Sequence, residues 1–239
     1  MSRTLLLLLT LLPALVSAQS LTILLEQADQ YRLQSAAAKV VSRVTLYEQG
    51  VMSKQRLYHV YTRPELHSLV LFKSPQEQGQ KMLMLGKDYW LMMPRSRRPI
   101  RITPLQKLLG EASVGDISTL TWSDSYHPLL VSQDQREMQL ELTAKAPGAS
   151  YQKIQLWLEK DSGFPLRAKL YLHSGKLAKV ARFIAGERGG HIMVIAMELT
   201  DSIQPGKRTL VEYLDITPTS LPDKYFNPAY LSRNRVDSL

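Results

Sequence analysis

The sequence has 239 residues, with 30 Lys and Arg against 21 Asp and Glu, a formal net charge of +9 and no cysteine. The missing cysteines exclude disulfides and a lipid attached through cysteine, so the chain must fold by its core alone. The length suits one large β domain or two small ones. The positive charge suits an anionic partner such as lipid headgroups, or is a solubility device.

The N-terminus has the pattern of a secretory signal peptide. Arg3 precedes a leucine-rich block at residues 5–12, which is far shorter than the ~20 residues of a membrane span. Val16 and Ala18 occupy the two positions that signal peptidase reads, so we expect cleavage after Ala18 and a mature chain of residues 19–239 that forms a single domain. The alternative is an uncleaved anchor, against which Pro13 argues by ending the apolar block early.

The mature chain is expected to open with one helix and continue in strands. Apolar residues at helical spacing and the alanine run at 36–38 predict an amphipathic helix over residues 21–39. From Val40 the apolar spacing changes to two, which predicts strands. Prolines at positions 94, 99 and 104 predict an interruption with loops and a short helix over residues 105–109.

After Arg136 the strand pattern resumes with glycine-containing turns between most segments. The predicted strands are 138–143, 154–159, 166–172, 177–184, 192–199 and 209–216. Strands joined by short turns pair antiparallel, and about ten of them in one sheet curl into a barrel or part-barrel. The aromatic segment after Pro222 is expected to pack as a short helix or coil against one end.

Residues for catalysis or metal binding are not apparent. The five histidines are scattered singly, without the i, i+4 pair that would hold a metal on one helix face. The segment Gly110–Gly115 spaces its serine one residue too far from the first glycine for a nucleophile elbow, and no phosphate-binding loop or dinucleotide fingerprint occurs. We therefore predict no enzyme activity, no cofactor and no metal.

Two apolar segments, residues 81–85 and 89–93, flank Gly86-Lys87-Asp88, which is expected to be a three-residue hairpin loop. With Leu85 paired to Tyr89, four side chains share one face of the hairpin and form an adaptable wall for acyl chains. They are Met82, Met84, Trp90 and Met92. The alternative is a hairpin that is simply buried on both faces.

Four arginines and no acid follow this hairpin in a proline-stiffened segment. They are Arg95, Arg97, Arg98 and Arg101. Their forked donors suit phosphate or carboxylate groups, and their position after the hairpin predicts a docking site at the rim of the cavity, for headgroups or for an acidic partner. The alternative is a solvated loop. Nucleic acid is not expected, because the chain is exported and the patch lacks interleaved aromatics.

These features together resemble a known family. The leader, the N-terminal helix, the run Tyr89–Pro94 into Arg97–Ile100, and Trp157–Leu166 are similar to the LolA-like outer-membrane lipoprotein-sorting proteins, in the longer branch associated with RND-type exporters. The resemblance covers essentially the whole mature chain. It implies an incomplete antiparallel β-barrel, mainly β with some α, with helices covering its concave face.

The resemblance also implies a function, which is to hold lipid or lipoprotein acyl chains in the periplasm of a Gram-negative bacterium. Handover toward the outer membrane would involve an RND-type inner-membrane exporter or an outer-membrane acceptor, without catalysis. A second function is a periplasmic sensor that uses the same half-barrel to detect mislocalised lipids and regulate an envelope stress response. A hydrolase ranks third. The sequence leaves the cargo open.

Overall fold

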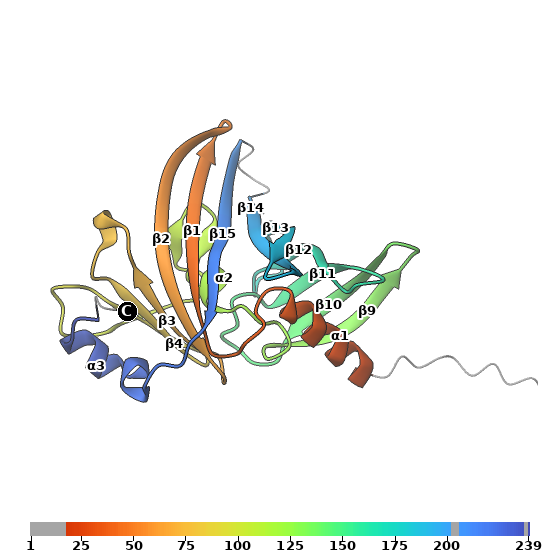
Figure 1. The fold of residues 1–239 in the computed structure, drawn as a ribbon. Coiled ribbons are helices and arrows are strands. Elements are labelled where there is room, and N and C mark those ends of the chain that lie inside the picture. The colour runs from red at the N-terminus through yellow and green to blue at the C-terminus, as the bar shows by residue number, and fades with distance from the viewer. Residues whose placement is uncertain (1–17, 202–205, 237–238) are drawn as a thin grey trace, which may run out of the picture.

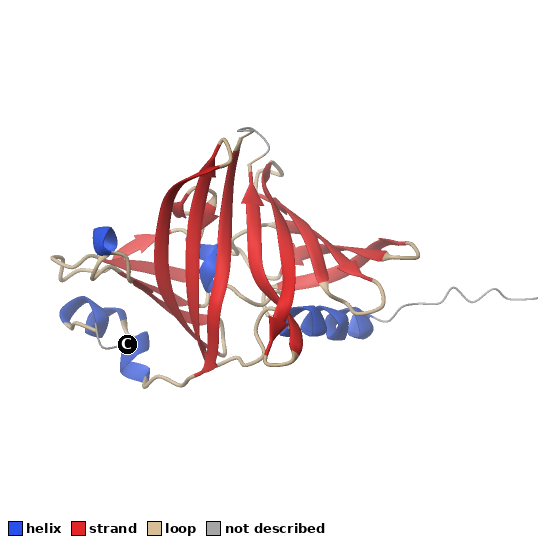
Figure 2. Ribbon diagram, turned by 45° about the horizontal axis from the view of Figure 1, so that its top comes forward, coloured by secondary structure: helices blue, strands red, loops and turns tan. Residues whose placement is uncertain are grey.

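The computed structural model describes residues 18–201, 206–236 and 239, most of them in strands (Figures 1 and 2). The predicted leader lies outside the described residues except for Ala18, at which the first helix begins. The elements are α1 (Ala18–Gln30), β1 (Ala38–Glu48), β2 (Val51–Arg63), β3 (His67–Phe72), η1 (Pro75–Glu77), β4 (Lys81–Leu85), β5 (Asp88–Met92), β6 (Ile100–Ile102), β7 (Lys107–Leu109), β8 (Ala112–Ser113), α2 (Val114–Ser118), β9 (Tyr126–Gln133), β10 (Glu137–Ala144), β11 (Lys153–Glu159), β12 (Pro165–Tyr171), β13 (Leu177–Arg188), β14 (His191–Thr200), β15 (Lys207–Pro218), η2 (Asp223–Phe226) and α3 (Pro228–Arg233).

Thirteen of the strands form one antiparallel sheet in the order β6-β5-β4-β3-β2-β1-β15-β14-β13-β12-β11-β10-β9. Neighbours in this order are neighbours along the chain except for β1 and β15, whose pairing joins the two halves. The strand order makes β6 and β9 the two edges of the sheet, and Figure 1 shows the sheet curled with β4 and β9 on opposite sides of the molecule. The predicted curled, incomplete barrel is therefore confirmed.

Each face of the sheet has its own apolar cluster. The inner cluster fills the concave side and includes Leu25 of α1 and Ile117 of α2, both fully buried, so helices cover this side as expected. The outer cluster lies on the other side of β2–β5, where η2 and α3 contribute Phe226 and Leu231. The C-terminal aromatic segment thus packs on the convex face of the sheet and not inside it.

The predicted N-terminal helix forms but ends nine residues earlier than predicted, and the helix predicted over residues 105–109 does not form. Helix α1 ends at Gln30, and the Asp29 carbonyl accepts the backbone N–H groups of Arg32 and Leu33 in the turn that follows. Ala38 is already the first residue of β1, where it pairs with Thr62. The sheet partners on both sides of β1 outweigh the helix propensity of the alanines. Residues 105–109 are also not helical, because Lys107–Leu109 is strand β7, paired with β8 across Gly110, whose φ of +55° suits a tight turn.

The β4–β5 hairpin differs from its prediction by one residue of register. Leu85 pairs with Asp88, so the loop is the two residues Gly86-Lys87, and Gly86 has a φ of +58°. A two-residue loop with glycine first fits the backbone twist of a hairpin, which explains why the shorter loop forms. Because side chains alternate along a strand, this one-residue shift moves every β5 side chain to the opposite face.

Candidate functional site

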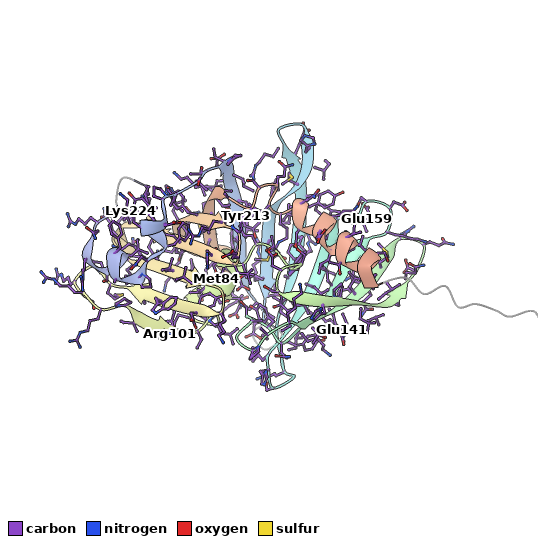
Figure 3. All side chains as sticks on the ribbon, turned by 90° about the horizontal axis from the view of Figure 1, so that it is seen from below. Met84, Arg101, Glu141, Glu159, Tyr213 and Lys224 are labelled. Atoms are coloured by element: carbon purple, nitrogen blue, oxygen red, sulfur yellow. The ribbon has the colours of Figure 1, made fainter. Side chains whose placement is uncertain are left out.

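A cavity of about 240 Å³, the mouth cavity, opens on the concave side where the two ends of the curled sheet approach each other. Its apolar wall includes Leu66, Met84 and Tyr89 from the first half of the chain and Tyr126 at the start of β9. The loop 145–150 between β10 and β11 forms the opposite wall. Figure 3 shows Met84 well inside the outline of the molecule, whereas Arg101 lies at its periphery.

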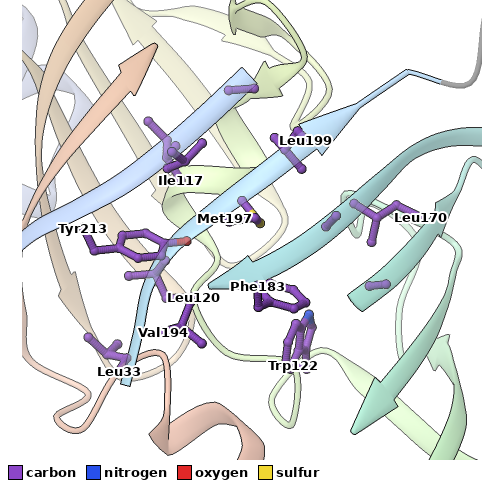
Figure 4. Close-up of a cluster of buried hydrophobic side chains, with 14 of the residues drawn as sticks. Leu33, Ile117, Leu120, Trp122, Leu170, Phe183, Val194, Met197, Leu199 and Tyr213 are labelled. Atoms are coloured by element: carbon purple, nitrogen blue, oxygen red, sulfur yellow. The ribbon is translucent and has the colours of Figure 1, made fainter. Parts of the chain in front are cut away.

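A smaller cavity of about 40 Å³, the deep cavity, adjoins the first and shares Thr119, Tyr126 and Ser150 with it. Its lining is mostly buried and aromatic or aliphatic. It includes Trp122 and Phe183, whose rings meet edge to face with their centroids 5.4 Å apart (Figure 4). The two cavities therefore lie next to each other and share part of their lining.

Helix α2 is held on this face by a buried ionic cluster. The Asp116 carboxylate lies 2.8 Å from the Lys179 ammonium of β13 and accepts the Tyr151 hydroxyl at 2.7 Å. It also accepts the backbone N–H and the hydroxyl of Ser113, both at 2.7 Å, which caps the helix. Burial and the negative charge of Asp116 raise the pKa of Tyr151 well above its usual value, so Tyr151 stays a neutral donor.

The packing of α2 is close as well as ionic. A Cβ added to Gly115 would lie 2.0 Å from the Ser150 hydroxyl oxygen, so only glycine permits this approach of α2 to the 145–150 loop. Asp29 at the end of α1 anchors the segment that follows α2, because its carboxylate accepts the backbone N–H groups of Trp122 and Ser123 at 2.7 and 2.8 Å. Burial raises the pKa of Asp29, and these hydrogen bonds oppose the rise.

The four apolar residues predicted to share a face do not share one. Met82 and Met84 lie in the inner cluster, and of the two only Met84 lines a cavity. Met92 is fully buried in the outer cluster, and Trp90 packs against that cluster. The one-residue register difference is the cause: Met84 faces Tyr89, and Leu83 faces Trp90. The hairpin is covered on both faces, which was the alternative to a ligand-binding wall.

The four arginines divide into a loop and a strand. Arg95, Arg97 and Arg98 are exposed in the loop after β5, which begins at the end of β5 remote from the cavity-lining Gly86-Lys87 turn. Arg101 lies on β6, donates to Asp88 at 2.6 Å and has its guanidinium carbon 4.9 Å from the Trp90 ring centroid. None of the four lines the mouth cavity or the deep cavity.

The cations at the mouth cavity are instead Lys87 and Lys145, both exposed, which sequence reasoning did not single out. They come from turns 58 positions apart, and a Cβ added to Gly148 would lie 3.2 Å from that of Lys87. No local pattern links these turns, because the sheet must curl before they meet. Among the residues the structure describes, no group of three potential metal ligands occurs, and no helix is long and apolar enough to cross a membrane.

Comparisons with known proteins agree with this architecture. A family model described only as an uncharacterized protein matches residues 65–233, and no curated protein matches the chain. A crystal structure of a LolA superfamily protein from Nitrosomonas europaea is 30% identical, covers 90% of this chain and 99% of its own, and has a TM-score of 0.79.

Two further crystal structures share the fold at lower identity. A DUF1329 family protein from Desulfovibrio piger is 22% identical with a TM-score of 0.68, and the match covers 90% of this chain and 98% of that one. A Vibrio parahaemolyticus domain assigned as an outer membrane lipoprotein-sorting protein is 20% identical with a TM-score of 0.69, covering 91% and 100%. The resemblance found in the sequence is confirmed by the 30% identity over nearly all of both chains: this chain belongs to the LolA superfamily.

Proposed function

We propose that the protein is a non-catalytic carrier that holds an acyl chain of a lipid or lipoprotein in the mouth cavity. The observation that carries this proposal is the largely apolar mouth cavity on the concave face, lined by Met84, Tyr89 and the 145–150 loop. Thioether and aromatic side chains adapt to a chain whose shape is not fixed. Membership of the LolA superfamily supports the same function.

A cargo with several chains needs more space than the mouth cavity offers, since pockets that enclose a drug-sized ligand measure about 300 Å³ or more. Helix α2 occupies the concave face next to the cavity, and the buried ion pair between Asp116 and Lys179 attaches it to β13. A larger cargo would therefore enter by displacing α2 toward solvent, which breaks this pair.

We propose the periplasm as the location of the protein, with residues 1–18 removed. Its partners would be an RND-type inner-membrane exporter or an outer-membrane acceptor, and the exposed Arg95, Arg97 and Arg98 would contact anionic headgroups or an acidic partner surface. An intact mass of protein from the periplasmic fraction should correspond to a chain that begins at Gln19. A mass that includes the leader would contradict the proposed location.

The carrier function is tested by mass spectrometry of lipids extracted from the protein after purification from its native envelope without detergent. We expect acyl lipids bound to a substantial fraction of the molecules. A folded preparation with no acyl lipid, which also fails to take up added fatty acid, would contradict the proposal.

A further inference from the structure

Arg32 is a buried cation, and two of its three guanidinium nitrogens have no hydrogen-bond partner among the described residues. It lies in the turn after α1, is 4% exposed and lines the deep cavity. Its Nε and Nη1 atoms have no hydrogen-bond partner among the described residues. A buried charged group without hydrogen bonds is costly, so a structure that retains one at a cavity wall has a place for an acceptor.

The surroundings of Arg32 are aromatic. Its guanidinium carbon lies 4.2 Å from the centroid of the Trp122 ring and 5.7 Å from that of Phe183. A guanidinium that lies over an aromatic ring contacts the ring with its flat face. Its N–H donors, which lie in the guanidinium plane, stay free for a planar acceptor. These contacts hold the group in position and do not satisfy its hydrogen bonds.

A second unused polar group lies near the first. The Tyr213 hydroxyl is buried and has no hydrogen-bond partner among the described residues, and Figure 4 shows it directed toward the side on which Phe183 and Trp122 lie. Burial raises the pKa of Tyr213, and both the charge of Arg32 and the close approach of its side chain to the hydroxyl oppose that rise, so the two groups are direct neighbours. The Ser150 hydroxyl, at the junction of the two cavities, is also buried without a partner.

The acids near Arg32 have other partners. Both oxygens of Asp29 accept backbone N–H groups, at 2.7 and 2.8 Å. Burial raises the pKa of Asp29, and the nearby charge of Arg32 opposes that rise. Asp116, which also lines the deep cavity, is held by Lys179, Tyr151 and Ser113. No carboxylate of the described chain fills the free donors of Arg32.

We infer that the deep cavity binds the carboxylate head of a long-chain fatty acid, with Arg32 and Tyr213 as donors and the chain extending into the mouth cavity. This inference rests on the proposed function and names the class of ligand. A planar carboxylate matches the forked donors of a guanidinium. A cavity of about 40 Å³ suits so small a head better than a phosphodiester that carries substituents on both sides.

The test compares ligands that share a sixteen-carbon chain, on the full mature chain and by calorimetry, at a pH where a free carboxyl is ionised. The probes are palmitate, hexadecanol and palmitoyl lysophosphatidate. We expect wild type to bind palmitate about tenfold more tightly than hexadecanol, and Arg32→Gln to remove this preference while hexadecanol binding stays within about twofold. Tyr213→Phe, which removes only the hydroxyl, should weaken palmitate binding by about threefold and leave hexadecanol binding unchanged.

Four results would overturn the inference. Equal binding of palmitate and hexadecanol to wild type would show that no head is recognised. An equal loss of palmitate and hexadecanol binding in Arg32→Gln would make Arg32 a structural residue. The same conclusion would follow if Arg32→Gln did not fold and Tyr213→Phe kept the wild-type preference for palmitate. Preferential binding of lysophosphatidate would assign the site to a phosphate head. Failure of wild type to bind either palmitate or hexadecanol contradicts the proposed function itself, so the two failures are distinguishable.

Discussion

Met84 and Tyr89 face each other across the β4–β5 hairpin, and both side chains line the mouth cavity. This pairing follows from the two-residue loop Gly86-Lys87 and places Trp90 on the opposite face, with its ring beneath Arg101. Of the three tryptophans, only Trp122 lines a cavity that we assign to the ligand. The fluorescence of each tryptophan should therefore report a different environment.

Palmitate that carries its bromine next to the carboxylate should quench Trp122 and leave the other two tryptophans unaffected. Quenching requires near contact, Trp122 lines the deep cavity, and Trp90 and Trp157 both stack with arginines away from it. The measurement uses three variants, each with one tryptophan retained and the other two changed to Phe. Quenching of Trp90 with Trp122 unaffected would place the acyl chain on the convex face.

Loss of Lys179 should destabilise the fold strongly, because Asp116 would remain buried without its counter-ion. For Lys179→Met we expect a loss of about 3 kcal/mol in the free energy of unfolding, measured by urea denaturation. The matched control is Arg43→Met, which breaks the half-exposed Arg43–Glu212 pair and should cost about 1 kcal/mol or less. Equal losses in the two variants would show that the buried pair does not fix α2.

His59 should make the protein less stable in mild acid. Burial, with the nearby charges of Lys39 and Lys73, lowers the pKa of His59 from 6.5 to about 4, so the unfolded chain binds a proton in this interval that the folded chain does not. Stability is therefore retained above pH 6.5 and lost as the pH falls toward 4, by about 1–3 kcal/mol. Thermal unfolding across this range should be less pH-dependent in His59→Gln. Parallel profiles for variant and wild type would exclude this role of His59.

The arginine loop should contribute to transfer and not to folding. Changing Arg95, Arg97 and Arg98 to Glu should strongly reduce cargo transfer to anionic acceptor membranes at low salt and leave the thermal midpoint unchanged, since all three are exposed. In wild type the same transfer should slow as salt rises. The charge-matched control changes Lys160, Lys169 and Lys176, which are also exposed, to Glu. Similar transfer by both triple variants would make the arginine loop an ordinary solvated loop.

The sequence predicts the strands of the sheet better than it predicts which face of the sheet each side chain occupies. Strands β10–β15 follow from period-two alternation and glycine turns, and the short connections predict antiparallel neighbours. Strand β9, which contains Pro128, was missed, because proline in a strand is typical only of edge strands, and β9 is an edge. The face assignment of β5 depended on a single loop residue, so a small error there moved Trp90 and Met92 out of the candidate site.

The site itself depends on long-range contacts that no local pattern contains. Lys87 and Lys145 line the same cavity only when the sheet curls, and the Asp116–Lys179 pair joins residues 63 positions apart. Arg32 resembles any polar residue after a helix, and its burial depends on Trp122 and Phe183, which come from distant segments. The resemblance to LolA-like proteins supplied the concave face, but it did not supply these residues.

If the mouth cavity holds the acyl chain, a large side chain that fills the cavity should block binding. Ala149 lines the mouth cavity, whereas Ala229 is exposed on α3 at the convex face, so Ala149→Trp and Ala229→Trp make the same change in the two places. Equilibrium binding of hexadecanol should weaken by about tenfold or more in Ala149→Trp and remain at the wild-type level in Ala229→Trp, with both variants folded. Unchanged hexadecanol binding in folded Ala149→Trp would show that the acyl chain does not occupy the mouth cavity.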